Sequence, residues 1–460
     1  MTIHAILDST CQTSAPSGQQ TAPAPRLRVP DRSRPLPECT IDDTLPSDHP
    51  ARILWEYVQQ LDLTAFLQTI RAVVGSPGRD ATDPRLLVAL WMYATTDAVI
   101  SARELNRLCT EHSAYRWLRG GVSVNYHLLA DFRCQHTEPL EELFQTHIAA
   151  LMQQELITLN RVALDGMRVR ASAGASSFRR TQTIEQLQLE VRQHIDELKA
   201  LHDDPHGSAS KAQKSAQKRH ANERLDRLAA AHKMAEQIEA DRQEYLRIHP
   251  KEAQERSQQD PKKTASRAST TDPEARKMKM ADGGTRPAYN VQLATTTADG
   301  IIVGVDVTNQ GNDCGLLGPM LEQIEADHGQ RPEEMLVDAG FASNEDIETA
   351  HAQGTTVYMP PRNEAKEKEQ GKNPYQAKKG DKAGMKAFRE RMGTPQAKTI
   401  YKLRASTAEW TNARMRQRGV SAFVVRGLAK VKAVMLWQAW VHNFWQAISR
   451  FPSQMPAAKV

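Results

Sequence analysis

Three acidic side chains in this sequence stand where a lone acid is unusual. Asp165 follows the apolar run Val162–Leu164 inside a strand-like stretch, where aspartate is disfavoured. Asp338 directly follows the short apolar run Met335–Val337. Glu409 is the one acid in a helical stretch whose other charged residues are all basic. Because hard cations take oxygen ligands, three carboxylates meeting at one end of a sheet would form a site for a divalent metal ion.

Each of these acids also has a purely structural explanation, and the sequence leaves these alternatives open. Asp165 could be satisfied by a neighbouring arginine, and Asp338 could form an Asx turn. Charged helices normally carry mixed signs on a solvated face, so a single acid among bases weakens that explanation for Glu409. If the three carboxylates do meet, they could hold two Mg²⁺ ions about 4 Å apart. Such a pair would activate a water molecule and stabilise the leaving oxygen of an in-line phosphoryl displacement.

A phosphodiester substrate would require basic and polar groups beside such a site. Tyr401, Arg404 and Arg416 lie roughly on the Glu409 side of one helix, where they could contact phosphate. Arg168 and Arg170 alternate with an apolar residue shortly after Asp165, and we count them among the candidate contacts to the same phosphodiester partner.

The composition limits the classes of protein that are possible. The chain has 460 residues, enough for two or three domains, and its net charge is +5 with the positive residues clustered, which favours a polyanionic partner. The five cysteines form no CxxC pair, which argues against a zinc site or a disulfide framework and favours a reducing cytoplasm. The N-terminus does not resemble a signal peptide. The longest apolar stretch, 431–448, is too polar to cross a bilayer, so we expect no membrane role.

The N-terminal third predicts a helical domain behind a flexible arm. Residues 1–46 are rich in Pro, Ser, Thr and Gln, and predict the arm. Apolar residues at helical spacing over 47–158 predict an all-helical DNA-binding domain, with a helix-turn-helix-like segment around Gly120 and Gly121. The candidate DNA contacts on the last helix of that segment are Asn125, His127 and Arg133. Short helices with glycine turns are also common in plain bundles, and that alternative stays open.

The rest of the chain predicts an α/β catalytic domain over 159–451 and a short tail over 452–460. Three strands should form a meander and two more should alternate with helices. The expected strands cover 161–170, 288–297, 301–308, 335–338 and 355–359. Two regions interrupt this pattern: a helical hairpin insertion at 181–277, with an apolar seam along two long helices, and a Lys-rich basic loop at 360–398.

Several blocks, in the same order, resemble the DDE transposases of bacterial insertion sequences, in the group with a Tyr-Arg-Glu-Lys signature. The matching residues are Asp165, Asp338 and Glu409, with Tyr401, Arg404 and Arg416 around the last acid. Further matching blocks are Thr271–Arg276, Asp282–Gly284, Tyr289-Asn290, Asp338–Ala342, Arg426–Lys430 and His442-Asn443. Arg416 stands where the signature has lysine, and Trp410 stands where many relatives have proline. Neither departure removes a carboxylate.

The resemblance implies a ribonuclease H-like mixed sheet with flanking helices. It also implies that Asp165, Asp338 and Glu409 are the catalytic carboxylates and bind Mg²⁺, with Mn²⁺ as a substitute. The implied activity is cleavage and strand transfer at the ends of the element that encodes the chain, in the cytoplasm at the nucleoid. The implied partners are double-stranded DNA, as terminal inverted repeats and target, and further copies of the chain in a homo-oligomer on DNA. The alternatives are an inactive relative that only binds DNA ends and a nuclease without strand transfer.

Overall fold

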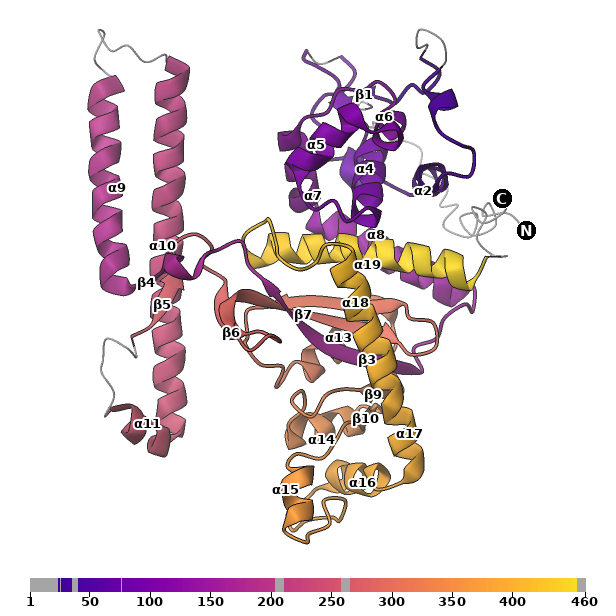
Figure 1. The fold of residues 1–460 in the computed structure, drawn as a ribbon, viewed down its shortest axis with the longest axis vertical. Coiled ribbons are helices and arrows are strands. Elements are labelled where there is room, and N and C mark those ends of the chain that lie inside the picture. The colour runs from indigo at the N-terminus through magenta and orange to yellow at the C-terminus, as the bar shows by residue number, and fades with distance from the viewer. Residues whose placement is uncertain are drawn as a thin grey trace, which may run out of the picture.

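The computed structural model describes residues 24, 26–34, 40–75, 77–202, 211–257 and 265–452. The described chain is a mixed α/β protein with a six-stranded sheet, an N-terminal helical bundle and a long helical hairpin (Figure 1). This architecture is consistent with the predicted ribonuclease H-like class. Most of the expected flexible arm, the tip of the hairpin and nearly all of the expected tail lie outside the described residues.

The N-terminal bundle begins its helices where the sequence predicts them. Its elements are η1 (Asp42–Thr44), α2 (Pro50–Gln59), α3 (Thr64–Leu67), α4 (Pro84–Thr96), α5 (Ala102–Glu111), α6 (Ser113–Arg119), α7 (Tyr126–Gln135) and α8 (Thr137–Gln153). The side chains of Asp83 and Ser101 accept hydrogen bonds from backbone N–H groups in the first turns of α4 and α5. Gly120 and Gly121 both have positive φ, which glycine tolerates, and they separate α6 from α7.

Residues 26–34 pack against this bundle, in contrast to the flexible arm that their composition predicts. β1 (Leu27–Arg28) pairs in parallel with β2 (Ala81–Thr82). The guanidinium carbon of Arg32 lies 3.4 Å from the centre of the Trp55 ring. Stacking of arginine on an aromatic ring is a tertiary contact, so the local composition of the segment gave no sign of it.

The sheet has the strand order β10-β9-β3-β7-β6, and β8 also pairs with β7. Its strands are β3 (Arg161–Arg170), β6 (Arg276–Lys279), β7 (Thr285–Thr296), β8 (Ile302–Thr308), β9 (Glu334–Leu336) and β10 (Thr356–Tyr358). β3, β7 and β8 are antiparallel neighbours, whereas β9 and β10 run parallel to β3, which confirms the predicted meander and alternation. β6 was not predicted, and it belongs to the sheet. The hairpin insertion therefore ends before residue 276, earlier than the expected boundary at 277.

Helices cover both faces of the sheet. α13 (Leu317–His328) packs on one face, where Gly304 leaves so little room that an added Cβ would lie 2.6 Å from the sulfur of Met320. α14 (Asn344–Ala352) connects β9 to β10 and begins at a capping box of Ser343 and Asp346. On the opposite face run α17 (Pro395–Arg404), the π-helical turn η3 (Ala405–Glu409) and α18 (Trp410–Gln417).

The last helix, α19 (Leu428–Arg450), connects the bundle to the sheet. Trp440 is fully buried, and its Nε1 donates to the Tyr57 hydroxyl of α2 at 3.1 Å. Asn443 forms two hydrogen bonds with the backbone of Ile302, at the start of edge strand β8. The bundle, α19 and the sheet consequently share one continuous hydrophobic core.

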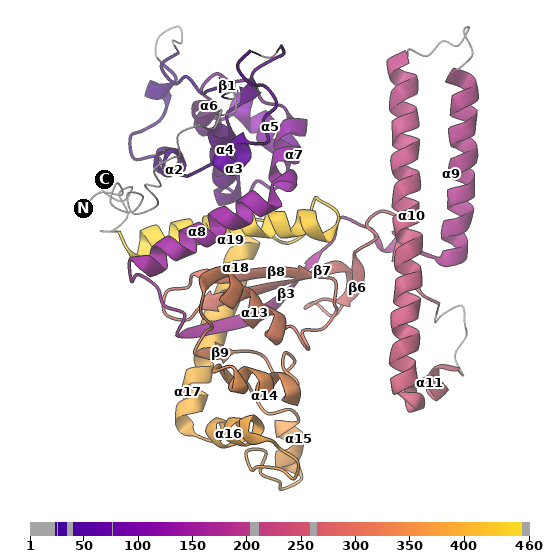
Figure 2. The ribbon, with the colours of Figure 1, turned by 180° about the vertical axis from the view of Figure 1, so that it is seen from behind.

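The helical hairpin stands apart from this body and has a small core of its own, as both views show (Figures 1 and 2). It consists of two long helices, α9 (Thr181–His202) and α10 (Lys211–Ile248). The segments at its base are η2 (Ala175–Ser177), β4 (Phe178–Arg180), α11 (Pro250–Ser257) and β5 (Arg267–Ser269). β4 and β5 pair in an antiparallel ladder. The stretch after α10 therefore contains a helix and a strand in addition to the two long helices.

The region 360–398, predicted to be a basic loop, contains two helices, α15 (Glu364–Glu369) and α16 (Ala383–Met392). The carboxylate of Glu348 accepts hydrogen bonds from the backbone N–H groups of Gly384 and Met385 and thereby holds the start of α16. Its lysines are not free charges throughout, because Lys378 pairs with Glu367 at 2.5 Å. These long-range contacts explain why composition alone suggested a loop.

Candidate active site

Asp165 stands in the middle of the central strand β3, and its side chain meets the helical segment formed by α17, η3 and α18. Its Oδ1 accepts a hydrogen bond from Arg404 Nη2 at 3.0 Å, and its Oδ2 accepts one from Asn412 Nδ2 at 2.9 Å. Burial raises the pKa of Asp165, and the positive charge of Arg404 opposes that rise. Arg404 is therefore the arginine partner that the structural explanation of Asp165 called for, and it is also a predicted DNA contact.

Asp338 comes two residues after the end of β9, the parallel neighbour of β3. The pairing sets Ala163 of β3 opposite Leu336, the last residue of β9. Asp338 is exposed, and its Oδ1 accepts a hydrogen bond from the backbone N–H of Ala339 at 2.7 Å. After burial and Arg404, its negative charge is among the influences on Asp165 and raises the pKa of that carboxyl.

Glu409 ends the π-helical turn η3, and its side chain is exposed. Within the described residues it makes no hydrogen bond or ion pair through its carboxylate. Nor does the described part of the chain contain a group of three His, Cys, Asp or Glu side chains arranged to hold a metal ion. The structure thus brings Asp165 and Asp338 together, whereas Glu409 lies on the exposed side of the adjacent helical segment.

Two protein-family models match the chain. A transposase DDE domain matches residues 263–444, and a transposase domain designated DUF772 matches residues 39–135. The chain belongs to the DDE transposases of insertion sequences. The DDE-domain match includes Asp338 and Glu409 but begins after β3, so Asp165 lies outside it. Searches of curated proteins and of solved structures found no match.

DDE transposases generally use divalent metal ions, and the donor chemistry of this site suits such an ion. Asp165 and Asp338 offer carboxylate oxygens, the hard ligands that Mg²⁺ and Mn²⁺ prefer. Asp338 is open to solvent, while Asp165 is partly buried with a positive charge on one oxygen. A cation at Asp165 would therefore have to replace Arg404, because two positive charges on one carboxylate oxygen repel each other.

Sequence reasoning singled out neither Asn412, which contacts Asp165, nor Asp313, which lies on the opposite face of β3 from Asp165. Asp313 lies against Gly166, where an added Cβ would be 2.2 Å from its Oδ1, and that oxygen accepts hydrogen bonds from Asn290 at 2.7 Å and Gln292 at 2.9 Å. Asp313 lies in an irregular loop with no periodic pattern to mark it. Asn412 was missed because an ideal α-helix would direct it away from Arg404.

Arg404 bonds Asp165 directly, and Tyr401 lies near enough to Asp165 and Asp338 for their charges to act on its hydroxyl. Burial raises the pKa of Tyr401 to about 12, so its hydroxyl remains protonated at neutral pH. Arg404 lowers that pKa, whereas the charges of Asp338 and Asp165 raise it further, which shows that the four side chains share one electrostatic environment.

The other arginines predicted to contact DNA differ in whether their guanidinium groups are already bonded within the protein. Arg168 donates to the Gly311 carbonyl at 3.0 Å and lies 3.6 Å from Asp313, so it is partly engaged within the protein. Arg170 and Arg416 are exposed, on β3 and α18 respectively. Their guanidinium groups are therefore available for an anionic partner.

The predicted contacts on α7 separate into two exposed residues and one core residue. Asn125 caps the helix by accepting from the backbone N–H of Leu128 at 2.9 Å, and His127 is exposed one residue beyond Tyr126. Arg133 is 5% exposed, donates to the Ile100 carbonyl at 2.6 Å and lies over the Trp91 ring. Its position supports packing of α7 and corrects the expectation of a DNA contact there.

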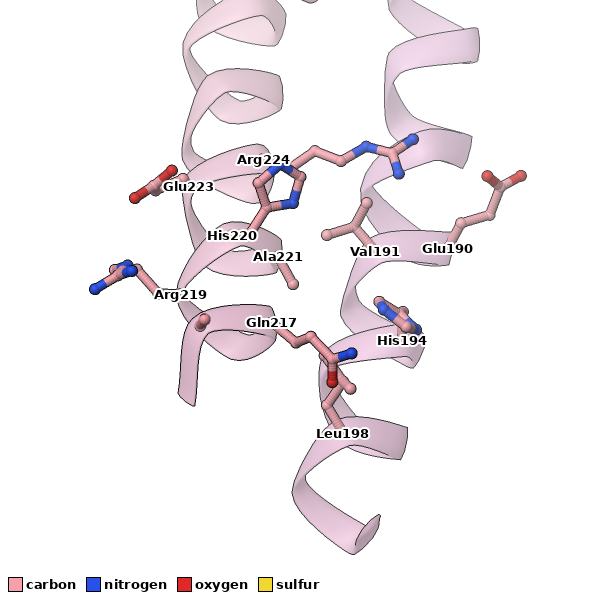
Figure 3. Close-up of a pocket in the computed structure, with 11 residues that line it drawn as sticks. Glu190, Val191, His194, Leu198, Gln217, Arg219, His220, Ala221, Glu223 and Arg224 are labelled. Carbon is pink, nitrogen blue, oxygen red and sulfur yellow. The ribbon is translucent and has the colours of Figure 1, made fainter. Parts of the chain in front are cut away.

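A cavity lies away from these carboxylates, between α9 and α10 of the hairpin (Figure 3). It opens between two helices, and its lining includes His194, His220 and Arg224 around an apolar floor of Val191 and Leu198. The residues that line this cavity include none of the predicted catalytic, metal-binding or DNA-binding residues. Among the described residues, no helix has the length and apolar character needed to cross a membrane.

Proposed function

We propose that this transposase cuts DNA at the ends of its own element and joins those ends to target DNA by metal-dependent in-line phosphoryl transfer. The proposal is supported by Asp165 on β3, which bonds Arg404, and by Asp338 just beyond the parallel strand β9, whose charge acts on Asp165. A buried acid next to an exposed acid, with a basic residue and a protonated tyrosine beside them, suits a phosphodiester substrate better than it suits a structural ion pair.

Asp165, Asp338 and Glu409 would together hold Mg²⁺ or Mn²⁺. When bound, the metal ions supply Lewis acidity toward the phosphodiester and lower the pKa of the attacking water. Glu409 is exposed and lacks a partner among the described residues, so it is free to turn toward the two aspartates. The proposal requires that this movement accompany DNA entry.

The remaining residues of the site would bind and orient DNA. Arg404 would leave Asp165 for a DNA phosphate, which gives its charge a new partner as the carboxylate takes up the cation. The protonated hydroxyl of Tyr401 would donate a hydrogen bond to the same backbone. Arg416 would add a phosphate contact from α18. Arg168 and Arg170 project from the face of β3 opposite to Asp165, so any phosphate contact they make would lie outside this site.

The N-terminal bundle would recognise the terminal DNA through α7. Asn125 and His127 are exposed at the start of that helix, the part that a helix-turn-helix protein presents to base edges. Two DNA ends must be held together for joining, so we propose that copies of this chain assemble on DNA.

The test is an assay with a plasmid that carries the DNA flanking the coding region, in Mg²⁺. Asp165→Asn, Asp338→Asn and Glu409→Gln should each abolish cleavage and leave DNA binding within a few-fold. Glu345→Gln, which removes an exposed acid on α14, is the control and should cut normally. Normal cleavage by any of the three variants would remove that residue from the site. Cleavage without joined product would identify a nuclease, and binding without cleavage by the native chain would identify an inactive relative.

A further inference from the structure

Asp165 has two hydrogen-bond donors of different character. Arg404 is charged, and it shares the environment of the exposed Asp338. Asn412 is neutral and 7% exposed, so its side chain cannot extend to a DNA backbone outside the protein. The donor that remains with Asp165 when Arg404 moves to phosphate is therefore Asn412.

The π-helical turn η3 makes this second contact possible. An α-helix advances about 100° per residue, so positions eight apart, such as 404 and 412, differ by about 80° around the axis. A π-helical turn acts as one inserted residue, which reduces this angle to about 20°. η3 consequently brings Asn412 onto the same side of the helical segment as Arg404, and both side chains bond Asp165.

Burial of Asn412 costs free energy, and an apolar side chain that served only to fill this space would not have that cost. Its Nδ2 donates to Asp165, but its Oδ1 is buried and has no hydrogen-bond partner among the described residues. An apolar residue of similar size would pack here without leaving a buried acceptor unpaired. The unpaired oxygen indicates that the amide is retained for its hydrogen bond to Asp165.

We propose that Asn412 is a positioning residue for Asp165, and that η3 exists to bring it into line with Arg404. This inference rests on the proposed function, because it assumes that Asp165 takes up a metal ion. A guanidinium and a metal ion compete for one carboxylate, whereas a neutral amide can hold one oxygen while the ion binds the other. Asn412 fixes the orientation of Asp165 throughout that exchange.

The experiment is a titration of the full-length protein with Mn²⁺ alone, followed by calorimetry and by the electron paramagnetic resonance signal of the free ion. Asn412→Ala should weaken Mn²⁺ binding by about tenfold, the usual cost of losing an outer hydrogen bond to a metal ligand. Asn412→Gln, which keeps an amide donor on a longer stem, should recover part of that loss. The matched control is Thr411→Val at the adjacent, equally buried position, whose hydroxyl bonds the Thr407 carbonyl and not Asp165. It should bind Mn²⁺ as the native chain does.

Thermal unfolding of each variant separates positioning from folding. We expect Asn412→Ala to melt within a few degrees of Thr411→Val while differing from it in Mn²⁺ affinity. Equal Mn²⁺ affinity in Asn412→Ala and Thr411→Val would overturn the inference. Asp165→Asn in the same titration tests the proposed function separately, because unchanged Mn²⁺ binding in that variant would show that Asp165 is no ligand. If Asp165→Asn loses binding and Asn412→Ala does not, only the positioning role fails.

Discussion

The hairpin and the body of this transposase are built in opposite ways. The hairpin packs α9 against α10 around a small core of mostly aliphatic residues and joins the body through the short β4–β5 ladder. In the body, by contrast, α19 packs on the N-terminal helices and on edge strand β8, so residues from both ends of the chain share one core. The candidate active site lies in the body and not in the hairpin.

This difference shows where long-range order is required. Asp165, Asp338 and Glu409 come from three distant parts of the sequence, so their relative positions depend on the whole body. A hairpin with its own core can vary without moving them. The division between bundle and catalytic domain that the sequence predicts is consequently weaker, in packing terms, than the division between body and hairpin.

The largest expected effect on the stability of the body comes from a substitution in α19. Trp440→Ala removes a fully buried indole and its hydrogen bond to Tyr57, so it should lower the free energy of unfolding by about 3–5 kcal/mol. Because the core is shared, protection from hydrogen exchange should fall together in α4 and in β8. Lys430→Ala, at an exposed position of the same helix, is the control. Loss of protection in the bundle alone would show two independent cores.

A smaller effect on the body is expected from removing the hairpin. Replacing residues 183–262 with a short Gly/Ser linker deletes most of α9 and all of α10 but keeps β4 and β5. The melting temperature of the body and its Mn²⁺ affinity should stay close to those of the native chain, because the hairpin core is separate. A shortened chain that fails to fold would place the hairpin within the body, and loss of joining alone would assign the hairpin to DNA or to a second copy.

The pH dependence of the free energy of unfolding tests the packing of the body at His442. Burial lowers the pKa of His442 on α19 to about 3, whereas an unfolded histidine titrates near 6.5. Between these values the unfolded state binds the extra proton, so stability due to neutral His442 is lost as the pH falls from about 6.5 toward 3. Each such proton contributes a slope of about 1.4 kcal/mol per pH unit.

The measurement is the free energy of unfolding from pH 7 to pH 4.5. His442→Gln should flatten the slope relative to the native chain, since glutamine does not titrate. His194→Gln, at an exposed position of the hairpin, should leave the slope as it is. An unchanged slope in His442→Gln would mean that His442 is solvated and can take up its proton in the folded protein.

The sequence predicted most elements of the body because their signals are local. The alternation of Val169 with two arginines marks β3, and the cap at Asp83 marks the start of α4. What it missed depends on contacts between distant residues. Arg32 stacks on Trp55 across the bundle, and Glu348 holds the start of α16 from another helix.

In the candidate site, too, sequence reasoning found the residues that have local signals and missed one that does not. Asp165 and Asp338 were identified from their positions relative to apolar runs, and the parallel pairing of β3 with β9 brings them near each other. Asn412 was missed because helical periodicity assumes about 3.6 residues per turn, and the π-helical turn η3 breaks that assumption just before it. A π-helical turn leaves no mark in hydrophobic spacing, so only the structure could show which side chains of this segment face Asp165.

The smallest expected effect concerns Arg416, which lies on the same helical segment as Glu409 but serves a different partner in our proposal. Seven residues at about 1.5 Å each separate the two positions by roughly 10 Å along the axis, too far for a close ion pair. Arg416 is exposed, so Arg416→Ala should weaken DNA binding and reduce the salt dependence of binding by about one counterion, with cleavage partly restored at high DNA concentration. Arg414→Ala is the matched control, because that guanidinium lies 5.7 Å from the Trp410 ring and is held to the protein surface. The measurement is DNA affinity at several salt concentrations for both variants. An unchanged salt slope in Arg416→Ala would remove this residue from the DNA surface and leave Arg404 as the arginine that contacts phosphate at the site.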